Sequence, residues 1–353
     1  KEAIIFCNGD NDTFPLWYNL EVEQERDDVR ACNLSYLQTD WYISQMKRPY
    51  YNSPGLPISW EYKDFMPGKN EVVWVENRLN APLEVKKAFQ FLHSDDPRTK
   101  RDGEGYIPSD QLYVLSPDSQ KIMFKKARRF TRSEMMVMEM LSTNEWQRPM
   151  YFAVTIGNDY HLGLDPYLEL TGLAYRITPE RSADGRPRVN TEVMYDNMLH
   201  KFKYGNMNVP GIYIDENTMR MCRTHRMMFM ELAEALYNEG KHDKCLEVLD
   251  FAEEMLPGYN IPYDYTSATM ASYYYQLGEM EKANAVMTKI ADNCAEYMVW
   301  GASLPKEQRA SSQSTLGHQM AVLGYVLQNF ERYEQKELFN YYYDIYAQYA
   351  SMR

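Results

Sequence analysis

The residues of this chain that could do chemistry form a run of acidic and amide side chains near its amino terminus. Asp10, Asn11 and Asp12 follow one another directly, and Asp40 stands in a second polar turn further along. Carboxylate and amide oxygens of this kind can bind sugar hydroxyl groups or a divalent cation. A calcium-binding EF-hand loop is excluded, because the later ligands and the terminal Glu of that motif are missing.

Two tryptophans stand beside these turns. Trp17 follows the first turn and Trp41 follows Asp40 directly. Since aromatic rings offer an apolar face with a polar edge, we hypothesise that the acidic turns and both tryptophans form a ligand-binding site. The alternative is that the carboxylates only cap helices, accepting N–H groups at the helix start. For each residue taken singly, capping is the simpler interpretation, and the two roles are compatible.

The elements predicted around these turns explain why the turns should lie together. Residues 3–8 form a short apolar run typical of a buried strand, residues 14–25 have helical spacing, and residues 29–36 form the next strand. A unit of this length predicts two adjacent parallel strands joined by a right-handed crossover. Because ligands collect at the carboxyl ends of parallel strands, both turns should lie on one rim of the sheet.

The first part of the chain is predicted to be an α/β domain over residues 1–219, with a mostly parallel sheet and a Rossmann-like crossover. Irregular insertions are expected at 49–70 and 94–110, where proline, glycine and charged residues gather. Further strands are predicted at 71–75, 150–156 and 172–177, and helices at 84–92 and 133–144.

From about residue 220 the pattern is helical throughout and contains an internal repeat. Small and large residues beginning at Leu232 recur 38 residues later at Met270. This period is slightly longer than the ~34 residues of a tetratricopeptide repeat, and an insert at 259–262 accounts for the difference. We predict an all-α domain over 220–353, with tetratricopeptide-like hairpins at about 226–257, 264–295 and 314–350.

A second group of polar residues stands at the start of the helical part. Asp215, Arg220, Arg223 and Arg226 could line a groove that binds an anion or a peptide. The simpler interpretation is a capped helix start, in which charged residues three positions apart pair along the helix. The sequence favours this second interpretation.

Several kinds of function are excluded or disfavoured. No dinucleotide-binding, phosphate-binding, zinc-protease or nucleophile-elbow motif occurs, so the sequence predicts neither a catalytic residue nor a cofactor. The six histidines are dispersed and the five cysteines lack Cys-x-x-Cys spacing, so no metal site is predicted. A net charge of −12 disfavours nucleic acid as a partner. No stretch approaches the roughly 20 apolar residues of a membrane-spanning helix.

A set of ordered motifs resembles one family. These motifs occupy residues 9–18, 33–43, 94–100, 148–153, 172–176, 195–197, 201–206 and 215–221. They resemble the carboxyl-terminal soluble region of bacterial multi-pass membrane proteins related to protein O-mannosyltransferases. The resemblance implies that membrane-spanning segments precede Lys1 and tether the chain to the extracytoplasmic (periplasmic) face of the inner membrane. It carries no catalytic residue onto this sequence, because such transferases hold their catalytic carboxylates in the membrane part.

Three hypotheses for function follow. The favoured one is an accessory module of a membrane glycosyltransferase-like protein, in which the acidic turns bind a glycan or peptide acceptor and the helical repeats hold a protein partner. Such a module is not catalytic by itself. The second is a structural or protein-interaction scaffold whose acidic turns are helix caps. A carboxylate-dependent hydrolase is the weakest, because no oriented nucleophile and base can be identified.

Overall fold

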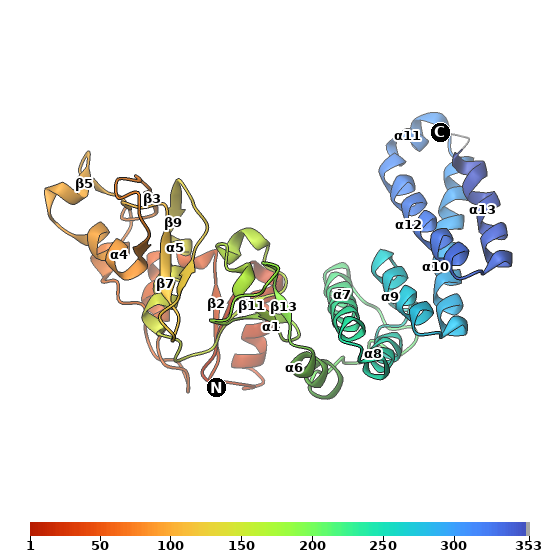
Figure 1. Ribbon diagram of the computed structural model, residues 1–353, viewed down its shortest axis with the longest axis horizontal. Helices are drawn as coiled ribbons and strands as arrows, with labels where there is room; N and C mark the ends of the chain where they lie inside the picture. The colour runs from red at the N-terminus through yellow and green to blue at the C-terminus, as the bar shows by residue number, and fades with distance from the viewer. Residues whose placement is uncertain (351–353) are drawn as a thin grey trace. The chain divides into compact units, whose positions relative to one another are not determined.

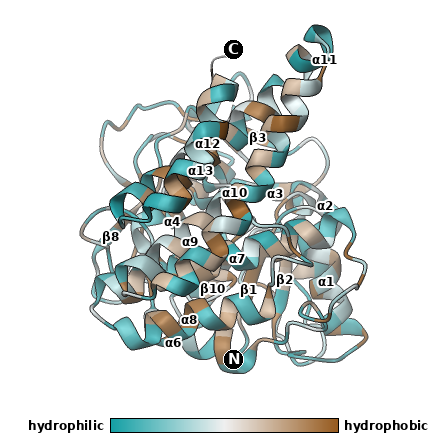
Figure 2. Cartoon of the chain, turned by 90° about the vertical axis from the view of Figure 1, so that its right-hand side faces the viewer, coloured by the Kyte–Doolittle hydropathy of each residue, from teal (hydrophilic) through white to brown (hydrophobic). Residues whose placement is uncertain are grey.

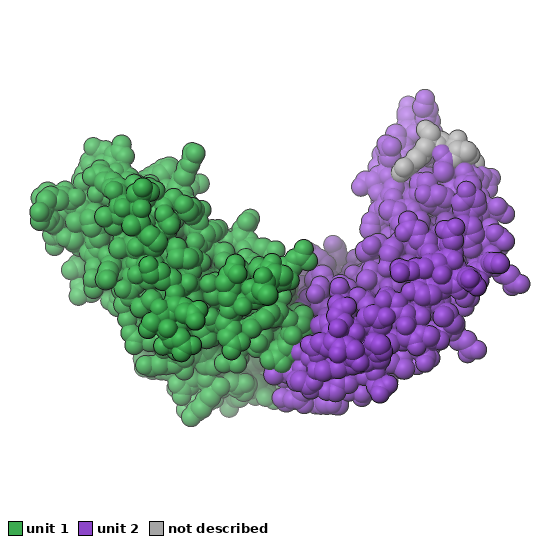
Figure 3. Space-filling view, in the orientation of Figure 1, with its two compact units in different colours: residues 1–190 green, residues 191–353 purple. Residues whose placement is uncertain are grey.

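The structure is a computed structural model that describes residues 1–350, and it divides the chain into two compact units. The first unit spans Lys1–Asn190 and the second spans Thr191–Arg353 (Figure 3). The sequence placed the change to helical structure at residue 220. The second unit begins earlier because α6 (Thr191–Asp196) is tied to the later helices: Glu192 forms ion pairs with Lys241 at 2.7 Å and Lys244 at 2.8 Å.

The first unit is built around a six-stranded mixed sheet with the strand order β13-β11-β12-β10-β1-β2. Its strands are β1 Ile4–Cys7, β2 Arg30–Asn33, β10 Met150–Ala153, β11 Leu168–Leu170, β12 Ala174–Ile177 and β13 Arg188–Val189. The predicted parallel crossover is present: β1 is parallel to both β2 and β10. The sheet as a whole is mixed, because β12 pairs antiparallel with both β10 and β11.

Helices and turns connect the parallel strands. Helix α1 (Asp10–Glu21) joins β1 to β2, and the single turn η1 (Tyr36–Gln38) and helix α2 (Asp40–Met46) follow β2. Apolar side chains of the strands form the core, where the rings of Phe6 and Phe152 lie 5.2 Å apart. The strand ends, and the turns that follow them, are thereby held in fixed positions.

The remaining elements of the first unit lie between β2 and β10 or between β10 and β11 along the chain. They are α3 Tyr62–Phe65, β3 Val72–Trp74, β4 Leu83–Glu84, α4 Val85–His93, η2 Pro97–Thr99, β5 Lys100–Arg101, β6 Glu104–Gly105, β7 Leu112–Leu115, β8 Lys121–Met123, β9 Arg129–Thr131, α5 Arg132–Asn144, η3 Asn158–His161 and η4 Asp165–Tyr167. Three small sheets pair β3 with β9, β4 with β7 and β8, and β5 with β6. The predicted helices at 84–92 and 133–144 are confirmed as α4 and α5.

Helix α5 is buried along most of its length and begins with a capping box. The Thr131 hydroxyl accepts a hydrogen bond from the Glu134 N–H at 3.4 Å, and Glu134 Oε2 accepts one from the Thr131 N–H at 2.8 Å. We expect Thr131→Ala to lower the free energy of unfolding by about 1 kcal/mol, measured by urea denaturation. Thr131→Ser, which keeps the hydroxyl, is the matched control. Equal stabilities of the two variants would contradict this assignment.

The second unit consists of helices, and no strand occurs among its described residues (Figure 1). After α6 and the short η5 (Asn197–Lys201), its helices are α7 Glu216–Asn238, α8 His242–Met255, α9 Tyr265–Gln276, α10 Met280–Ser303, α11 Lys306–Ser311, α12 Gln313–Arg332 and α13 Lys336–Ala350. The three predicted hairpins are present as helix pairs α7/α8, α9/α10 and α12/α13. Gly240 and Gly278, with φ of 73° and 86°, make the turns inside the first two pairs.

The helices of the second unit are amphipathic. Figure 2 shows hydrophilic and hydrophobic residues side by side along them. The small residues predicted to let paired helices approach are buried, among them Ala233, Ala271 and Ala283. Within residues 1–350, no helix combines the length and the apolar character that crossing a membrane requires.

Candidate functional site

The predicted acidic residues lie beyond the carboxyl ends of β1 and β2. Asp10, Asn11 and Asp12 form the first turn of α1, and Asp40 is the first residue of α2. Because β1 and β2 are neighbouring parallel strands, both turns occupy one edge of the sheet, as the sequence predicted. Asp10 and Asn11 are exposed, whereas Asp12 and Asp40 are half-buried.

None of these carboxylates caps its helix. The N-cap residue of α1 is Gly9 and that of α2 is Thr39, and neither makes a side-chain capping hydrogen bond. The prediction that Asp10, Asp12 or Asp40 acts as an N-cap is therefore wrong. From within the first turn, the carboxylates instead complement the positive end of the helix dipole.

Two of the carboxylates make specific hydrogen bonds to other segments. Asp12 Oδ2 accepts a hydrogen bond from the Thr155 hydroxyl at 2.6 Å, just beyond β10. Asp40 Oδ2 accepts one from the Tyr62 hydroxyl at 3.1 Å, and this bond raises the pKa of Tyr62. These bonds point to different segments, so the acidic turns do not form one converging cluster of free oxygens.

A buried polar layer fixes the two turns relative to each other. The Thr13 hydroxyl donates to the Gly9 carbonyl and accepts from Asn33 Nδ2, both at 2.7 Å. Asn33, at the end of β2, also accepts from the Tyr36 N–H at 3.0 Å through Oδ1 and donates its own N–H to the Tyr42 hydroxyl at 2.9 Å. Thr13 and Asn33 are fully buried. The start of α1 and the segment leading to α2 are thus locked together.

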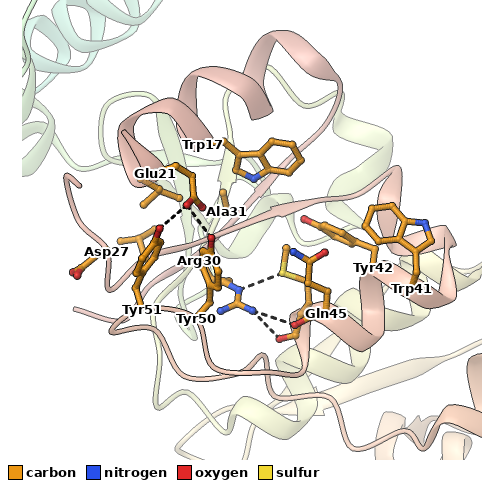
Figure 4. Close-up of a pocket in the computed structure, with 13 residues that line it drawn as sticks. Trp17, Glu21, Asp27, Arg30, Ala31, Trp41, Tyr42, Gln45, Tyr50 and Tyr51 are labelled. Atoms are coloured by element: carbon orange, nitrogen blue, oxygen red, sulfur yellow. Dashed lines mark hydrogen bonds between the residues drawn. The ribbon is translucent and has the colours of Figure 1, made fainter. Parts of the chain in front are cut away.

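A pocket of about 240 Å³ opens beside this layer, between α1, β2, α2 and the segment after α2 (Figure 4). We call it the aromatic pocket; its ring-bearing residues are Trp17, Trp41, Tyr42, Tyr50 and Tyr51, and its charged residues are Glu21, Asp27 and Arg30. The structure therefore brings together the two predicted tryptophans. The predicted residues Asp10, Asn11, Asp12 and Asp40 do not line this pocket.

The two tryptophans are linked by a third ring. The centroid of the Tyr36 ring lies 6.2 Å from that of Trp17, with the rings stacked, and 6.0 Å from that of Trp41. Trp41 is 54% exposed, and Trp17 is half-buried. A row of aromatic rings at a pocket opening can hold the apolar face of a flat ligand.

A fixed carboxylate stands among the tyrosines of the pocket. Glu21 Oε2 accepts hydrogen bonds from the Tyr50 and Tyr51 hydroxyls, both at 2.8 Å (Figure 4). The bond to Glu21 raises the pKa of Tyr50 well above its usual value, so this tyrosine stays protonated and remains a donor. The Glu21 carboxylate is thereby oriented beside the pocket.

A buried arginine completes the pocket lining. Arg30 is 5% exposed, and its Nη2 donates to the Arg48 carbonyl at 2.8 Å. Its Nη1 is buried and has no hydrogen-bond partner. Burial lowers the pKa of Arg30, but a guanidinium stays protonated at neutral pH. The guanidinium also lies over the Tyr50 ring, 5.6 Å from its centroid. The charged guanidinium of Arg30 therefore holds one unpaired N–H donor beside the aromatic rings.

The sequence pointed to the tryptophans of this pocket but missed its polar residues. Glu21 ends a helix, Arg30 lies in a strand, and Tyr50 and Tyr51 lie in an insertion interpreted as irregular. The available signals were an arginine inside an otherwise apolar strand and a tyrosine pair directly after a proline. Neither feature alone identifies a site.

Comparison with known protein families shows to which family the chain belongs. Residues 1–197 match the family described as TMEM260-associated domain 2. The chain belongs to this family. The match covers more than half of the chain and includes both acidic turns and the whole aromatic pocket, and the family is linked by its description to a membrane protein. No curated protein matches the chain. No solved structure matches it either.

The second predicted group lies beyond the TMEM260-associated domain 2. Asp215 caps α7: its Oδ1 accepts from the N–H groups of Asn217 at 2.8 Å and Thr218 at 3.1 Å. The hydrogen bond from the Thr218 hydroxyl, together with these two backbone bonds, lowers the pKa of Asp215. Arg220 donates to Asn217 Oδ1 at 2.7 Å, and Arg223 is exposed. The capped helix start predicted for Asp215 is confirmed.

The fourth member of that group is placed differently from the other three. Arg226 is 2% exposed, and its guanidinium donates to the carbonyls of the loop between α8 and α9. It is therefore directed into the protein and not toward a surface shared with Asp215, Arg220 and Arg223. The four residues do not line one groove. Among residues 1–350, no group of three or more His, Cys, Asp and Glu side chains is arranged to hold a metal ion.

Proposed function

We propose that this chain is an extramembrane accessory module of a membrane glycosyltransferase-like protein related to protein O-mannosyltransferases. In this proposal it binds a glycan or a peptide acceptor at the aromatic pocket, and it is not catalytic by itself. The observation that carries the proposal is the row of Trp17, Tyr36 and Trp41 beside the oriented carboxylate of Glu21 and the buried Arg30. Membership of a family linked to a membrane protein supports the membrane context.

The chemistry of the pocket matches what a sugar ring presents. One face of a pyranose carries C–H groups that pack on an aromatic ring, while its hydroxyl groups both donate and accept hydrogen bonds. The rings of Trp17 and Trp41 can supply the first contact, and Glu21 and Arg30 an acceptor and a donor. A volume of about 240 Å³ is small for a ligand site, which favours a single sugar unit over a long oligosaccharide.

The second unit supports a role in holding a protein partner. We propose that its hairpins α7/α8, α9/α10 and α12/α13 are tetratricopeptide-like repeats, because small residues are buried where the paired helices approach. Helical arrays of this kind bind partners on extended surfaces. In this proposal, membrane-spanning segments that precede Lys1 tether the module to the periplasmic face of the bacterial inner membrane.

A structural scaffold remains the second candidate. It is favoured by the hydrogen bonds of Asp12 to Thr155 and of Asp40 to Tyr62, which join separate segments of the fold. A carboxylate-dependent hydrolase has less support, since the carboxylates of the two acidic turns, such as Asp12 and Asp40, do not line the aromatic pocket.

The glycan-binding proposal predicts a loss of affinity on Trp41→Ala. A glycan array is first used to find the preferred sugar, and calorimetry then measures its affinity for the intact chain and for the variants. We expect Trp41→Ala and Trp17→Ala to weaken binding roughly tenfold, because each removes one aromatic contact. The melting temperature should stay unchanged for Trp41→Ala, since this side chain is 54% exposed.

The matched control is Trp300→Ala, which removes a tryptophan that is 45% exposed in the second unit. It should leave glycan affinity unchanged. The proposal is wrong if the intact chain binds no glycan on the array, or if Trp41→Ala binds as tightly as the intact chain. In that case the scaffold interpretation is favoured.

A further inference from the structure

A second cavity, of about 460 Å³, lies in the first unit and shares no lining residue with the aromatic pocket. Three separate segments supply its polar side chains. Ser59 and Trp60 come from the insertion before α3, and Glu139 and Thr143 belong to α5. Helix α4 supplies Lys86, Gln90 and His93, and Ser94 follows it directly. We call this space the Glu139 cavity.

Glu139 is a buried carboxylate with one oxygen left open. It is 2% exposed, and its Oε1 accepts three hydrogen bonds: from the Ser59 N–H at 2.8 Å, the Ser59 hydroxyl at 2.5 Å and the Thr143 hydroxyl at 3.1 Å. Its Oε2 accepts no hydrogen bond from the described residues, and none of their Lys or Arg side chains forms an ion pair with it. Buried carboxylates are ordinarily paired or fully hydrogen-bonded. The fixed Oε1 therefore orients an unused acceptor at the cavity.

Two further polar atoms of the lining have no partner. Trp60 Nε1 and His93 Nε2 are buried and make no hydrogen bond. The two rings pack edge to face with their centroids 4.4 Å apart. A buried tryptophan N–H usually finds an acceptor, so its lack of one is unusual.

The protonation of His93 follows from its surroundings. Burial lowers the pKa of His93, which favours the neutral imidazole, and its Nδ1 lies 3.9 Å from Asp64 Oδ2. A neutral imidazole has one donor and one acceptor nitrogen. The nearby Asp64 carboxylate favours a proton on Nδ1, which leaves Nε2 as the acceptor. The residues that line the cavity then carry two unpaired acceptors, Glu139 Oε2 and His93 Nε2, and one unpaired donor, Trp60 Nε1.

We propose that the Glu139 cavity binds a monosaccharide-sized polyol through neighbouring hydroxyl groups. A hydroxyl group donates one hydrogen bond and also accepts, so adjacent hydroxyls can match this mixed set of two acceptors and one donor. A primary ammonium group only donates, so it would leave the Trp60 N–H unpaired. The volume is within the range of small-molecule sites. This site is separate from the aromatic pocket, so its test does not depend on the function proposed above.

The test follows the indole N–H signals of the intact, ¹⁵N-labelled chain during titration with methyl pyranosides. The Trp60 signal is assigned with Trp60→Phe. We expect a saturable shift of the Trp60 signal, and Glu139→Gln should weaken the binding that it reports by about tenfold, since an amide NH₂ cannot accept in place of Oε2. Glu104→Gln removes an exposed carboxylate and should leave the affinity unchanged.

Trp41→Ala separates the two sites, because it should weaken the binding that the Trp17 signal reports while the Trp60 titration stays unchanged. If Glu139→Gln does not fold, as judged by circular dichroism, His93→Phe takes its place and should weaken binding in the same direction. Three results would overturn the proposal: no Trp60 shift with any pyranoside, equal shifts in the intact chain and Glu139→Gln, or a shift with ethylamine but not with pyranosides.

Discussion

Replacing Arg226 with methionine is expected to lower the free energy of unfolding of the second unit by about 3 kcal/mol. The guanidinium of Arg226 is buried and donates from Nη2 to the carbonyls of Leu256 and Ile261, both at 2.8 Å, and from Nη1 to that of Pro262 at 3.0 Å. These carbonyls belong to the loop between α8 and α9. Methionine replaces much of the side-chain volume but donates nothing, so the buried carbonyls lose their partner.

Thermal unfolding followed by circular dichroism measures this effect. A loss of about 3 kcal/mol corresponds to a fall of roughly 6–12 °C in the melting temperature of a unit of this size. Arg223→Met, on the exposed face of the same helix, is the matched control and should change the stability by less than about 0.5 kcal/mol. If the two variants have the same melting temperature, the hydrogen bonds of Arg226 do not stabilise the loop.

Arg132→Met is expected to destabilise the first unit by a similar amount, about 3 kcal/mol. Arg132 is 2% exposed at the start of α5, and its guanidinium donates to the carbonyls of Gln38 and Lys69, both at 2.6 Å. Gln38 lies just before α2, which carries Trp41. The arginine therefore holds the segment that positions one wall of the aromatic pocket.

This variant should show two effects together: a lower free energy of unfolding of the first unit and weaker binding of the glycan found on the array. Urea denaturation measures the first effect and calorimetry the second. Arg128→Met, an exposed arginine close by in sequence, is the control and should change neither. Loss of stability with full glycan affinity would show that the Arg132 contacts do not position Trp41.

The parts of the fold that sequence analysis predicted correctly depend on short-range patterns. The β1-α1-β2 crossover and the three helix pairs each lie within a few tens of residues, where hydrophobic periodicity and turn residues are sufficient. The mixed character of the main sheet was not predicted. It comes from β12, which pairs antiparallel with β10 and β11. The position of β10 beside β1, with Met150 opposite Ile4, was not predicted either, because no local pattern specifies a pairing between residues so far apart.

The acidic turns show a second feature that the sequence did not predict correctly, the position of the helix cap. The sequence identified Asp10, Asp12 and Asp40 correctly as helix-start residues, but it placed them at the capping position. In the structure Gly9 occupies that position in α1, because its φ of 83° lets the chain turn from strand to helix one residue earlier. Whether a side chain caps a helix depends on one backbone angle, and the residue type alone does not determine that angle.

By itself, the sequence determined the strands and helices around the two turns, the helix pairs of the second unit, and that Trp17 and Trp41 stand beside two turns on one rim. Only the tertiary structure decided what surrounds those tryptophans. Glu21, Arg30 and Tyr50 come from a helix end, a strand and an insertion, and each is ordinary in its own segment. The same holds for Arg226, whose burial depends on a loop some thirty residues away. A charged side chain becomes part of a pocket or of a core only through the segments that pack around it, and these contacts are long-range.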